Sequence, residues 1–411
     1  MLVRTGPSST FDFSPHVRDS DVVTWLQGTG EPLGLTQRLV AQRHALPPLE
    51  LFVGMLSSKT LKPEHADRFR FRGLNGAGTA RTLTAANLLD SVPAHVSAVP
   101  SLLRSRAIRG DVLVLRVRPH TRPGFFTAGV MVDFLPALLQ AARCVIAEID
   151  ERLPVTSQDA LVAAEDIDVL TECDADEVLI ADPEPTEIDR RVAAHVAGLI
   201  PDGATIQLGV GALPVAVCRA LEHHKNLGVH SGVISDIIVD LVEKGVITPA
   251  RRMVTGGLFG TRRLMKFADG NDMIEMRSSD YTHNHQVLAR LPNLYSVNSG
   301  VEVDLTGNVN SEIAAGRYLG AVGGQADFVR GAVASLGGRS IMALPSTTPD
   351  GKHSRIVASL EGRPVTTTRA DIDIVVTEYG IADLRGRSFG ERAERLRAIA
   401  HPDFRDRLQL K

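Results

Sequence analysis

Two short segments that are apolar along almost their whole length constrain the fold most strongly. Residues 111–117 read DVLVLRV, and residues 144–149 read CVIAEI. A strand with one solvated face alternates apolar and polar residues, whereas a nearly unbroken apolar run is typical of a strand that is buried on both faces. Such strands occur in parallel sheets that helices cover on each side. We therefore expect an α/β protein with mainly parallel sheets.

The rest of the chain repeats the same alternation of strands and helices. Apolar strand patterns alternate with segments of helical periodicity, which indicates parallel strands joined by crossover helices. The expected strands also include residues 22–26, 49–56, 205–208, 340–344 and 372–377, and the expected helices are residues 35–45, 134–142, 187–200, 214–223 and 389–400.

A chain of 411 residues is too long for one ordinary hydrophobic core, so we expect two domains. The best linker candidate is residues 182–187, DPEPTE, because two prolines and three acids continue neither a helix nor a strand. Residues 1–20 are rich in Ser, Pro and Asp and are predicted to form a loose arm. The predicted domains are residues 21–186 and residues 187–411.

Composition excludes several classes of function. A formal charge of -3 and only 4% aromatic residues argue against nucleic acid as a partner. No apolar run reaches the roughly 18 residues of a membrane span, and the N-terminus has no apolar signal-peptide core. Cys144, Cys173 and Cys218 are far apart, which fits a reducing compartment better than a disulfide framework or a zinc site. We expect a cytoplasmic protein.

Residues 227–245, LGVHSGVISDIIVDLVEKG, are the first candidate for chemistry. An apolar run broken by glycines passes into a helical pattern that stops at Gly245, a usual helix end. We expect a turn at His230, Ser231 and Gly232, where two polar side chains and a bare backbone lie between apolar segments.

Two glycine clusters are further candidates. In residues 205–214, TIQLGVGALP, a strand enters a helix through Gly209 and Gly211, which leaves N–H groups for a phosphate or a carbonyl oxygen. The pattern is not GxGxxG, so a Rossmann dehydrogenase is disfavoured, and a purely structural turn is an equal alternative. In residues 320–328, GAVGGQADF, converging N–H groups could form an oxyanion hole for acyl transfer, and a mobile glycine loop is the alternative.

Glu378 and a histidine pair complete the candidates. Glu378 ends an apolar strand, at the carboxyl end where open α/β sheets bind ligands, although a structural ion pair with Arg385 or Arg369 would also explain it. His283 and His285 could ligate a metal, but no third ligand completes the set, so no metal is expected.

Many segments, in this order, resemble the acetyl-CoA hydrolase/transferase family, which includes 4-hydroxybutyrate CoA-transferases. The resemblance runs from about residue 24 to the C-terminus. It implies two α/β domains of the CoA-transferase type with the active site in the cleft between them. The matching segments include GTGEP at 28–32, VIAEIDERLP at 145–154, IQLGVGALPVAV at 206–217, VGGQADFVRGA at 322–332, VVTEYGIADLRG at 375–386 and AHPDFRDRL at 400–408.

The resemblance also implies a mechanism and a set of site residues. In the family, a glutamate attacks the acyl-CoA thioester and becomes a glutamyl-CoA thioester, and an acceptor carboxylate then takes the CoA. The position of that glutamate falls at Gly232. The other implied positions are Gly324 as oxyanion donor with its neighbours Gly323 and Gln325, Asn284 as a holder of the substrate carboxylate, Glu378 as the acid of the TEYG-like motif, and the segment containing Gln207, Gly209 and Gly211 near the CoA cleft.

Gly232 cannot form an acyl anhydride, so the resemblance leaves the activity open. His230 or Glu378 could activate water, and an acyl ester on Ser231 would not exchange readily with CoA. We expect an acyl-CoA-utilising enzyme that performs thioester hydrolysis or altered acyl-CoA chemistry, including chemistry on the acyl chain. The alternatives are a CoA-transferase of the 4-hydroxybutyrate/acetate type that uses Glu378, and a non-catalytic acyl-CoA-binding subunit. The expected partners are an acyl-CoA, a small carboxylic acid and further copies of the chain in a homodimer or larger assembly.

Overall fold

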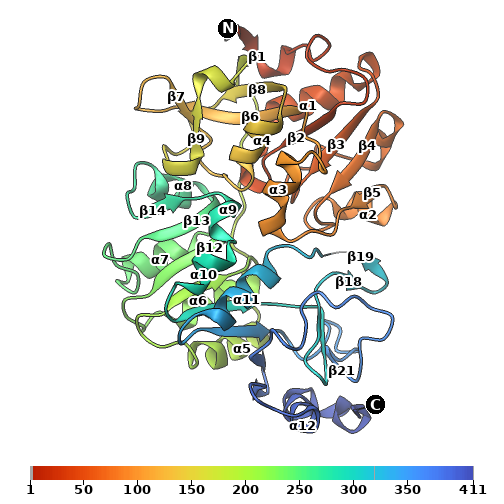
Figure 1. Cartoon of the computed structure of the whole chain (residues 1–411), viewed down its shortest axis with the longest axis vertical. Helices are drawn as coiled ribbons and strands as arrows, with labels where there is room; N and C mark the ends of the chain where they lie inside the picture. The colour runs from red at the N-terminus through yellow and green to blue at the C-terminus, as the bar shows by residue number, and fades with distance from the viewer. Residues whose placement is uncertain (1–2, 319, 411) are drawn as a thin grey trace. The chain divides into compact units, whose positions relative to one another are not determined.

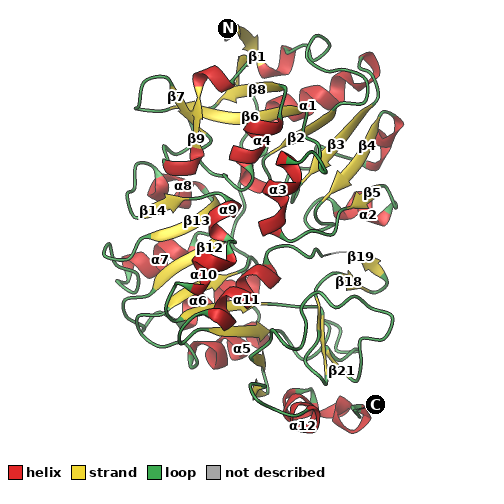
Figure 2. Cartoon of the chain, viewed as in Figure 1, coloured by secondary structure: helices red, strands yellow, loops and turns green. Residues whose placement is uncertain are grey.

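The computed structural model describes residues 3–318 and 320–410, and it confirms the α/β architecture with mainly parallel sheets (Figure 2). The chain forms two compact units, coloured along the sequence in Figure 1. The first unit contains Met1–Ala181 and Val254–Tyr281, and the second contains Asp182–Met253 and Thr282–Lys411. The first crossing between units lies at the start of the predicted linker. The return of residues 254–281 to the first unit was not predicted, because no Pro-rich or acidic segment marks it.

The first unit is built on one large sheet. Its main strands follow the order β1-β10-β8-β6-β2-β3-β4-β5, and all seven neighbouring pairs are parallel. These strands are β1 (Val3–Pro7), β2 (Val22–Trp25), β3 (Leu49–Val53), β4 (Phe69–Gly73), β5 (Leu89–Ser91), β6 (Val112–Pro119), β8 (Cys144–Ile149) and β10 (Val169–Glu172). The side chains from Val112 to Val117 are all buried, as the unbroken apolar run predicts.

Helices and short strands complete the first unit. They include α1 (Leu33–Gln42), α2 (Arg81–Ala85), α3 (Val99–Arg104), α4 (Leu135–Ala141), α8 (Arg262–Ala268), β7 (Phe125–Thr127), β9 (Leu161–Ala163) and β14 (Ile274–Met276). β13 (Met253–Leu258) begins at the boundary between the units. Within the first unit, its backbone bonds to residues 130–132. Val132 N donates to Gly256 O at 2.8 Å, and Leu258 N donates to Val130 O at 2.8 Å.

The structure corrects the prediction of a loose N-terminal arm. β1 pairs in parallel with β10 at the edge of the sheet. Phe11 and Phe13 then enter the core of the first unit, where their rings meet edge to face with centroids 4.9 Å apart. Two buried aromatic side chains within a polar segment supply enough apolar area to hold it in place.

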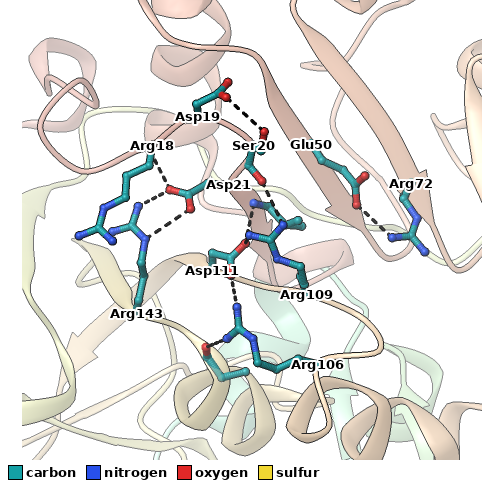
Figure 3. Close-up of polar contacts among 12 residues, drawn as sticks. Arg18, Asp19, Ser20, Asp21, Glu50, Arg72, Arg106, Arg109, Asp111 and Arg143 are labelled. Atoms are coloured by element: carbon teal, nitrogen blue, oxygen red, sulfur yellow. Dashed lines mark hydrogen bonds and ion pairs between the residues drawn. The ribbon is translucent and has the colours of Figure 1, made fainter.

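An ion-pair network joins the amino ends of β2 and β6 (Figure 3). Asp111, which is 3% exposed, accepts from Val22 N at 2.9 Å and pairs with both Arg106 and Arg109 at 2.6 Å. Asp21 pairs with Arg143 on the neighbouring turn. The carboxylates therefore satisfy backbone and guanidinium donors where the strands begin, which fixes the start of the sheet.

The second unit has its own sheet, in the order β12-β11-β15-β20-β22-β23, parallel except for the last pair. The strands are β11 (Thr205–Leu208), β12 (Gly228–Ile234), β15 (Leu294–Asn298), β20 (Arg339–Ala343), β22 (Ile374–Thr377) and β23 (Gly380–Asp383). The helices include α5 (Glu187–Ala197), α6 (Ala212–Ala220), α7 (Ile237–Glu243), α10 (His285–Ala289), α11 (Gln325–Ala334) and α12 (Phe389–Ile399).

Local signals explain where several helices of the second unit begin. Thr186 caps α5 in a capping box with Asp189, so the predicted linker ends directly at a helix start. Ser388 caps α12 in the same way with Glu391. No helix among residues 3–318 and 320–410 combines the length and the apolarity needed to cross a membrane.

Candidate active site

The segment His230-Ser231-Gly232 lies inside β12, and this corrects the prediction of a turn. The strand runs unbroken from Gly228 to Ile234, and the helix that follows begins only at Ile237. Because side chains alternate along a strand, residues 230 and 232 share one face of the sheet and residue 231 faces the other way. The three candidate residues are therefore divided between the two faces.

Ser231 belongs to the apolar face. Its hydroxyl donates to the carbonyl of Leu208 at 2.9 Å, and the side chain is 2% exposed. It lines a small apolar cavity together with Ile206, Val229 and Ile238. The structure thus places Ser231 apart from Gly232, with its hydroxyl already committed to a backbone acceptor.

His230 and Gly232 lie on the opposite face, where a short chain of polar contacts begins. The Nε2 atom of His230 is 3.0 Å from the carbonyl oxygen of Thr282. The hydroxyl of Thr282 is 2.9 Å from Nδ1 of His283. Both histidines and Thr282 are buried. Thr282 therefore lies between the two imidazoles, with its backbone oriented toward one and its side chain toward the other.

The imidazole of His283 lies next to both candidate glycines, Gly232 and Gly324. A β-carbon on Gly232 would lie 3.1 Å from Cε1 and 3.2 Å from Nε2 of His283. A β-carbon on Gly324 would lie only 2.4 Å from the same Nε2, so no side chain fits there without movement. The next atom near position 232 is Cε2 of Phe328 at 3.8 Å, and the rings of His283 and Phe328 have centroids 4.6 Å apart. Gly232, Gly324 and the His283 imidazole form one cluster, called here the His283 cluster.

Gly324 places a helix start in this cluster. It is the N-cap residue of α11, so N–H groups of the first helical turn lack partners within the helix. Such groups attract negative charge and can stabilise an oxyanion. Gly323, at φ +58°, makes the turn that leads into the helix. The side chain of Gln325 is held outside the cluster, since it bonds to Ser311 and Thr367 at 2.9 Å each.

A buried amide network lies on the same face of the sheet as His230. Gln207 Oε1 accepts from Ser296 Oγ at 2.7 Å and from Asn298 Nδ2 at 3.1 Å. These side chains come from the carboxyl ends of β11 and β15, the edge at which open α/β sheets bind ligands. Gly209 and Gly211 follow β11, and Gly211, at φ +118°, caps α6.

Burial keeps both histidines uncharged. It lowers the pKa of His230 to about 4. Burial, with a smaller contribution from the neighbouring His230, lowers the pKa of His283 to about 3. At neutral pH the face next to Gly232 therefore carries neutral imidazoles and backbone donors.

Comparison with known proteins identifies the family. Residues 9–182 match the model of the acetyl-CoA hydrolase/transferase N-terminal domain, and residues 260–411 match the model of the C-terminal domain. The chain belongs to the acetyl-CoA hydrolase/transferase family. It is therefore an enzyme of acyl-CoA hydrolase or CoA-transferase type, as the resemblance predicted.

Individual members of the family align over nearly the whole chain. The 4-hydroxybutyrate coenzyme A transferase of Clostridium kluyveri is 37% identical over 395 residues, covering 94% of this chain and 92% of the relative. The crystal structure of RipA from Yersinia pestis matches with a TM-score of 0.89 at 31% identity, covering 96% and 93%. The 4-hydroxybutyrate CoA-transferase structure from Porphyromonas gingivalis matches with a TM-score of 0.80 at 31% identity, covering 96% and 93%. The fold is thus the CoA-transferase type.

Asn284 and Glu378, two further positions taken from the family resemblance, also lie outside the His283 cluster. Asn284 caps α10, where its Oδ1 accepts from the backbone N–H of Gln286 at 2.9 Å. Glu378 follows β22 and accepts from Ser346, from the backbone N–H at 2.9 Å and from the hydroxyl at 2.6 Å. The alternative ion pair with Arg385 or Arg369 is not formed, because Arg385 pairs with Asp383 and the guanidinium of Arg369 lies over the ring of Phe389.

His283 is the member of this cluster that the sequence did not connect with Gly232. It stood out only as a possible metal ligand with His285, which is exposed, and no group of three or more His, Cys, Asp or Glu side chains among the described residues could hold a metal ion. Its place beside Gly232 depends on how the segment after β14 packs against β12. No local pattern in the sequence reports that contact.

Proposed function

We propose that this chain hydrolyses acyl-CoA thioesters, at the face of the second unit that holds Gly232 and Gly324. One observation carries the proposal: Gly232, the position to which the resemblance assigns the family's glutamate, has no side chain and lies in a cluster with a neutral imidazole and the N-cap of α11. A site of this kind can polarise a thioester carbonyl but cannot take the acyl group onto a carboxylate.

The proposed reaction consumes water. The thioester carbonyl oxygen accepts hydrogen bonds from N–H groups at the start of α11, which stabilises the negative charge that develops on it. The oxygen of a water molecule bonds to the carbonyl carbon, the carbon–sulfur bond breaks, and one proton passes to the sulfur. The products are a carboxylic acid and free CoA.

The position of Glu378 favours hydrolysis over transfer through that residue. The strand order places β12 and β22 four spacings apart. At about 4.8 Å for each spacing, Glu378 lies roughly 19 Å from Gly232 across the sheet. A carboxylate at that distance cannot attack a carbonyl carbon that is held next to Gly324. Both oxygens of Glu378 also accept hydrogen bonds from Ser346.

The test is incubation of the protein with a panel of short acyl-CoAs, with and without acetate, while free CoA and newly formed acetyl-CoA are measured separately. We expect free CoA to accumulate at the same rate in both conditions. Formation of acetyl-CoA that requires acetate would contradict hydrolysis and support a transferase. Tight binding of acyl-CoA without any turnover would support a non-catalytic binding subunit instead.

A further inference from the structure

We propose that His283 is the general base of this site, with Nε2 as the atom that takes a proton from the attacking water. This inference rests on the proposed hydrolysis. It assigns the chemistry to a residue outside the positions of the family's glutamate mechanism. The ligand class that the site takes is a thioester carbonyl together with one water molecule.

The first argument is position. Nε2 of His283 lies 3.2 Å from the β-carbon position of Gly232 and 2.4 Å from that of Gly324. The imidazole therefore lies next to Gly232, where the absent side chain leaves space, and next to Gly324, which starts α11. A carbonyl held by the N-terminus of α11 and a water in the space beside Gly232 would both lie next to this one nitrogen. A general base must reach the proton that it removes at about 2.6–3.2 Å.

The second argument is the contact at the other ring nitrogen. Nδ1 of His283 is 2.9 Å from the hydroxyl of Thr282. When Nδ1 carries the proton and donates it to that hydroxyl, the lone pair of the neutral ring is on Nε2. In that arrangement Thr282 acts as a positioning residue, because its hydroxyl accepts the Nδ1 proton and Nε2 is left to take a proton from water. The ring of Phe328 also packs against the imidazole, with centroids 4.6 Å apart and the planes tilted by 55°.

The third argument is charge. No proton has to be removed from His283 before it acts, because burial keeps it neutral, with a pKa of about 3 in the free protein. A buried imidazole is a weak base on its own. The oxyanion that forms as water attacks is an opposite charge close by, and it stabilises the imidazolium in the same step. His230 on the same face is also titratable, and burial keeps it neutral as well, while Asp327 lies in the first turn of α11.

The step balances without a further reactant. As the water oxygen bonds to the carbonyl carbon, one water proton moves to Nε2 and the carbonyl electrons move to the oxygen held at α11. The tetrahedral intermediate collapses, the carbon–sulfur bond breaks, and the proton on Nε2 passes to the CoA sulfur. His283 ends the cycle neutral.

The test compares His283→Gln with His285→Gln, an exposed histidine two residues away on the same segment. We expect His283→Gln to lower kcat for hydrolysis at least 100-fold, within the usual range for loss of a general base, while the dissociation constant for acyl-CoA changes less than about threefold. We expect His285→Gln to keep kcat within about twofold. Thr282→Val should lower kcat about tenfold without changing acyl-CoA affinity. A His283→Gln protein that keeps half of the wild-type kcat would overturn the assignment.

A second measurement does not depend on turnover or on the stability of the variant. The ¹⁵N chemical shifts of the His283 ring in the wild-type protein report which nitrogen carries the proton, and we expect a protonated Nδ1 and an unprotonated Nε2 at pH 7. A proton on Nε2 at this pH would overturn the base role even if hydrolysis is observed. If the wild-type protein hydrolyses no acyl-CoA, the proposed function fails, and that result is obtained before any variant is compared.

Discussion

The Nε2 atom of His283 lies 3.2 Å from the place where a β-carbon on Gly232 would stand. This distance is closer than ordinary van der Waals contact between a β-carbon and a neighbouring side chain. The identity of residue 232 and the identity of residue 283 are therefore coupled by space. A longer side chain at one position requires a smaller or displaced side chain at the other.

Gly232→Glu should be destabilising alone and better tolerated together with His283→Asn, which is smaller. We expect the single Gly232→Glu change to cost about 1–3 kcal/mol of unfolding free energy, because the new side chain crowds the imidazole. Urea unfolding of the wild type, both single variants and the double variant gives the coupling energy, expected at about 1–2 kcal/mol in favour of the pair. The double variant should also gain acetate-dependent CoA transfer.

If the changes in unfolding free energy of the two single variants sum to that of the double variant within about 0.5 kcal/mol, this coupling is contradicted. The same four proteins separate the two activities, because hydrolysis releases free CoA and transfer produces acetyl-CoA from acetate. Transfer by the Gly232→Glu protein at the same level as by the double variant would show that His283 does not restrict the carboxylate.

Gly324→Ala should disrupt the site even though it adds one methyl group. Its β-carbon would lie 2.4 Å from Nε2 and 2.6 Å from Cδ2 of His283, so the imidazole must move. We expect a stability loss of about 1–3 kcal/mol and at least a tenfold loss of kcat, measured by thermal unfolding and by release of CoA. Gly390→Ala in α12 is the matched control, because nothing lies within 4 Å of its β-carbon position and alanine favours a helix. Equal effects of the two substitutions would refute this contact.

The contribution of the two buried histidines to the stability of the protein should fall as the pH is lowered from about 6.5 to about 4. The pKa of His230 is about 4 and that of His283 about 3 in the folded protein, because both are buried, whereas both return to about 6.5 on unfolding. In this window the two histidines bind more protons in the unfolded chain than in the folded chain, so acid weakens their contribution to stability. Asp133 and Glu148, whose pKa burial raises to about 7, contribute with the opposite sign, so the histidine contribution is read from the variants. His283→Gln should remove about one proton from the slope of unfolding free energy against pH, while His285→Gln should keep the wild-type slope. Urea unfolding at several pH values measures both, and an unchanged slope for His283→Gln would contradict the burial of a neutral imidazole.

Glu378→Gln should leave hydrolysis within about threefold of the wild type. A glutamine keeps one oxygen to accept from Ser346, so we expect a stability change of only about 1–2 kcal/mol. Borohydride reduction of the wild type in the presence of acyl-CoA, followed by peptide mass spectrometry, tests for a thioester on Glu378, and none is expected. A reduced Glu378, or a loss of activity above 100-fold in the variant, would support the transferase alternative.

The sequence predicted the sheets well because their signal is local. The apolar run at β6 and the glycine that starts α11 both lie where the pattern indicated. The buried Phe11 and Phe13 were missed, because two aromatic residues in a polar segment have no periodicity. His230 and Gly232 were expected in a turn, because a glycine often interrupts a strand. In the structure the strand continues, and the missing side chain of Gly232 allows His283 to approach it. The contact between His283 and Gly232 joins distant segments, so only the folded chain reveals it.

The path of the chain also bears on how the protein is completed during synthesis. The strand segment that bonds to Val130 and Val132 of the first unit is made after about a third of the second unit has been translated. An N-terminal fragment that ends at residue 181 therefore lacks the β13 partners of the backbone groups of Val130 and Val132. Translation must proceed beyond residue 281 before the first unit can complete its fold. By then, Asp182–Met253 of the second unit has already been synthesised. The two units consequently mature together, and neither can be expressed as an uninterrupted piece of the gene.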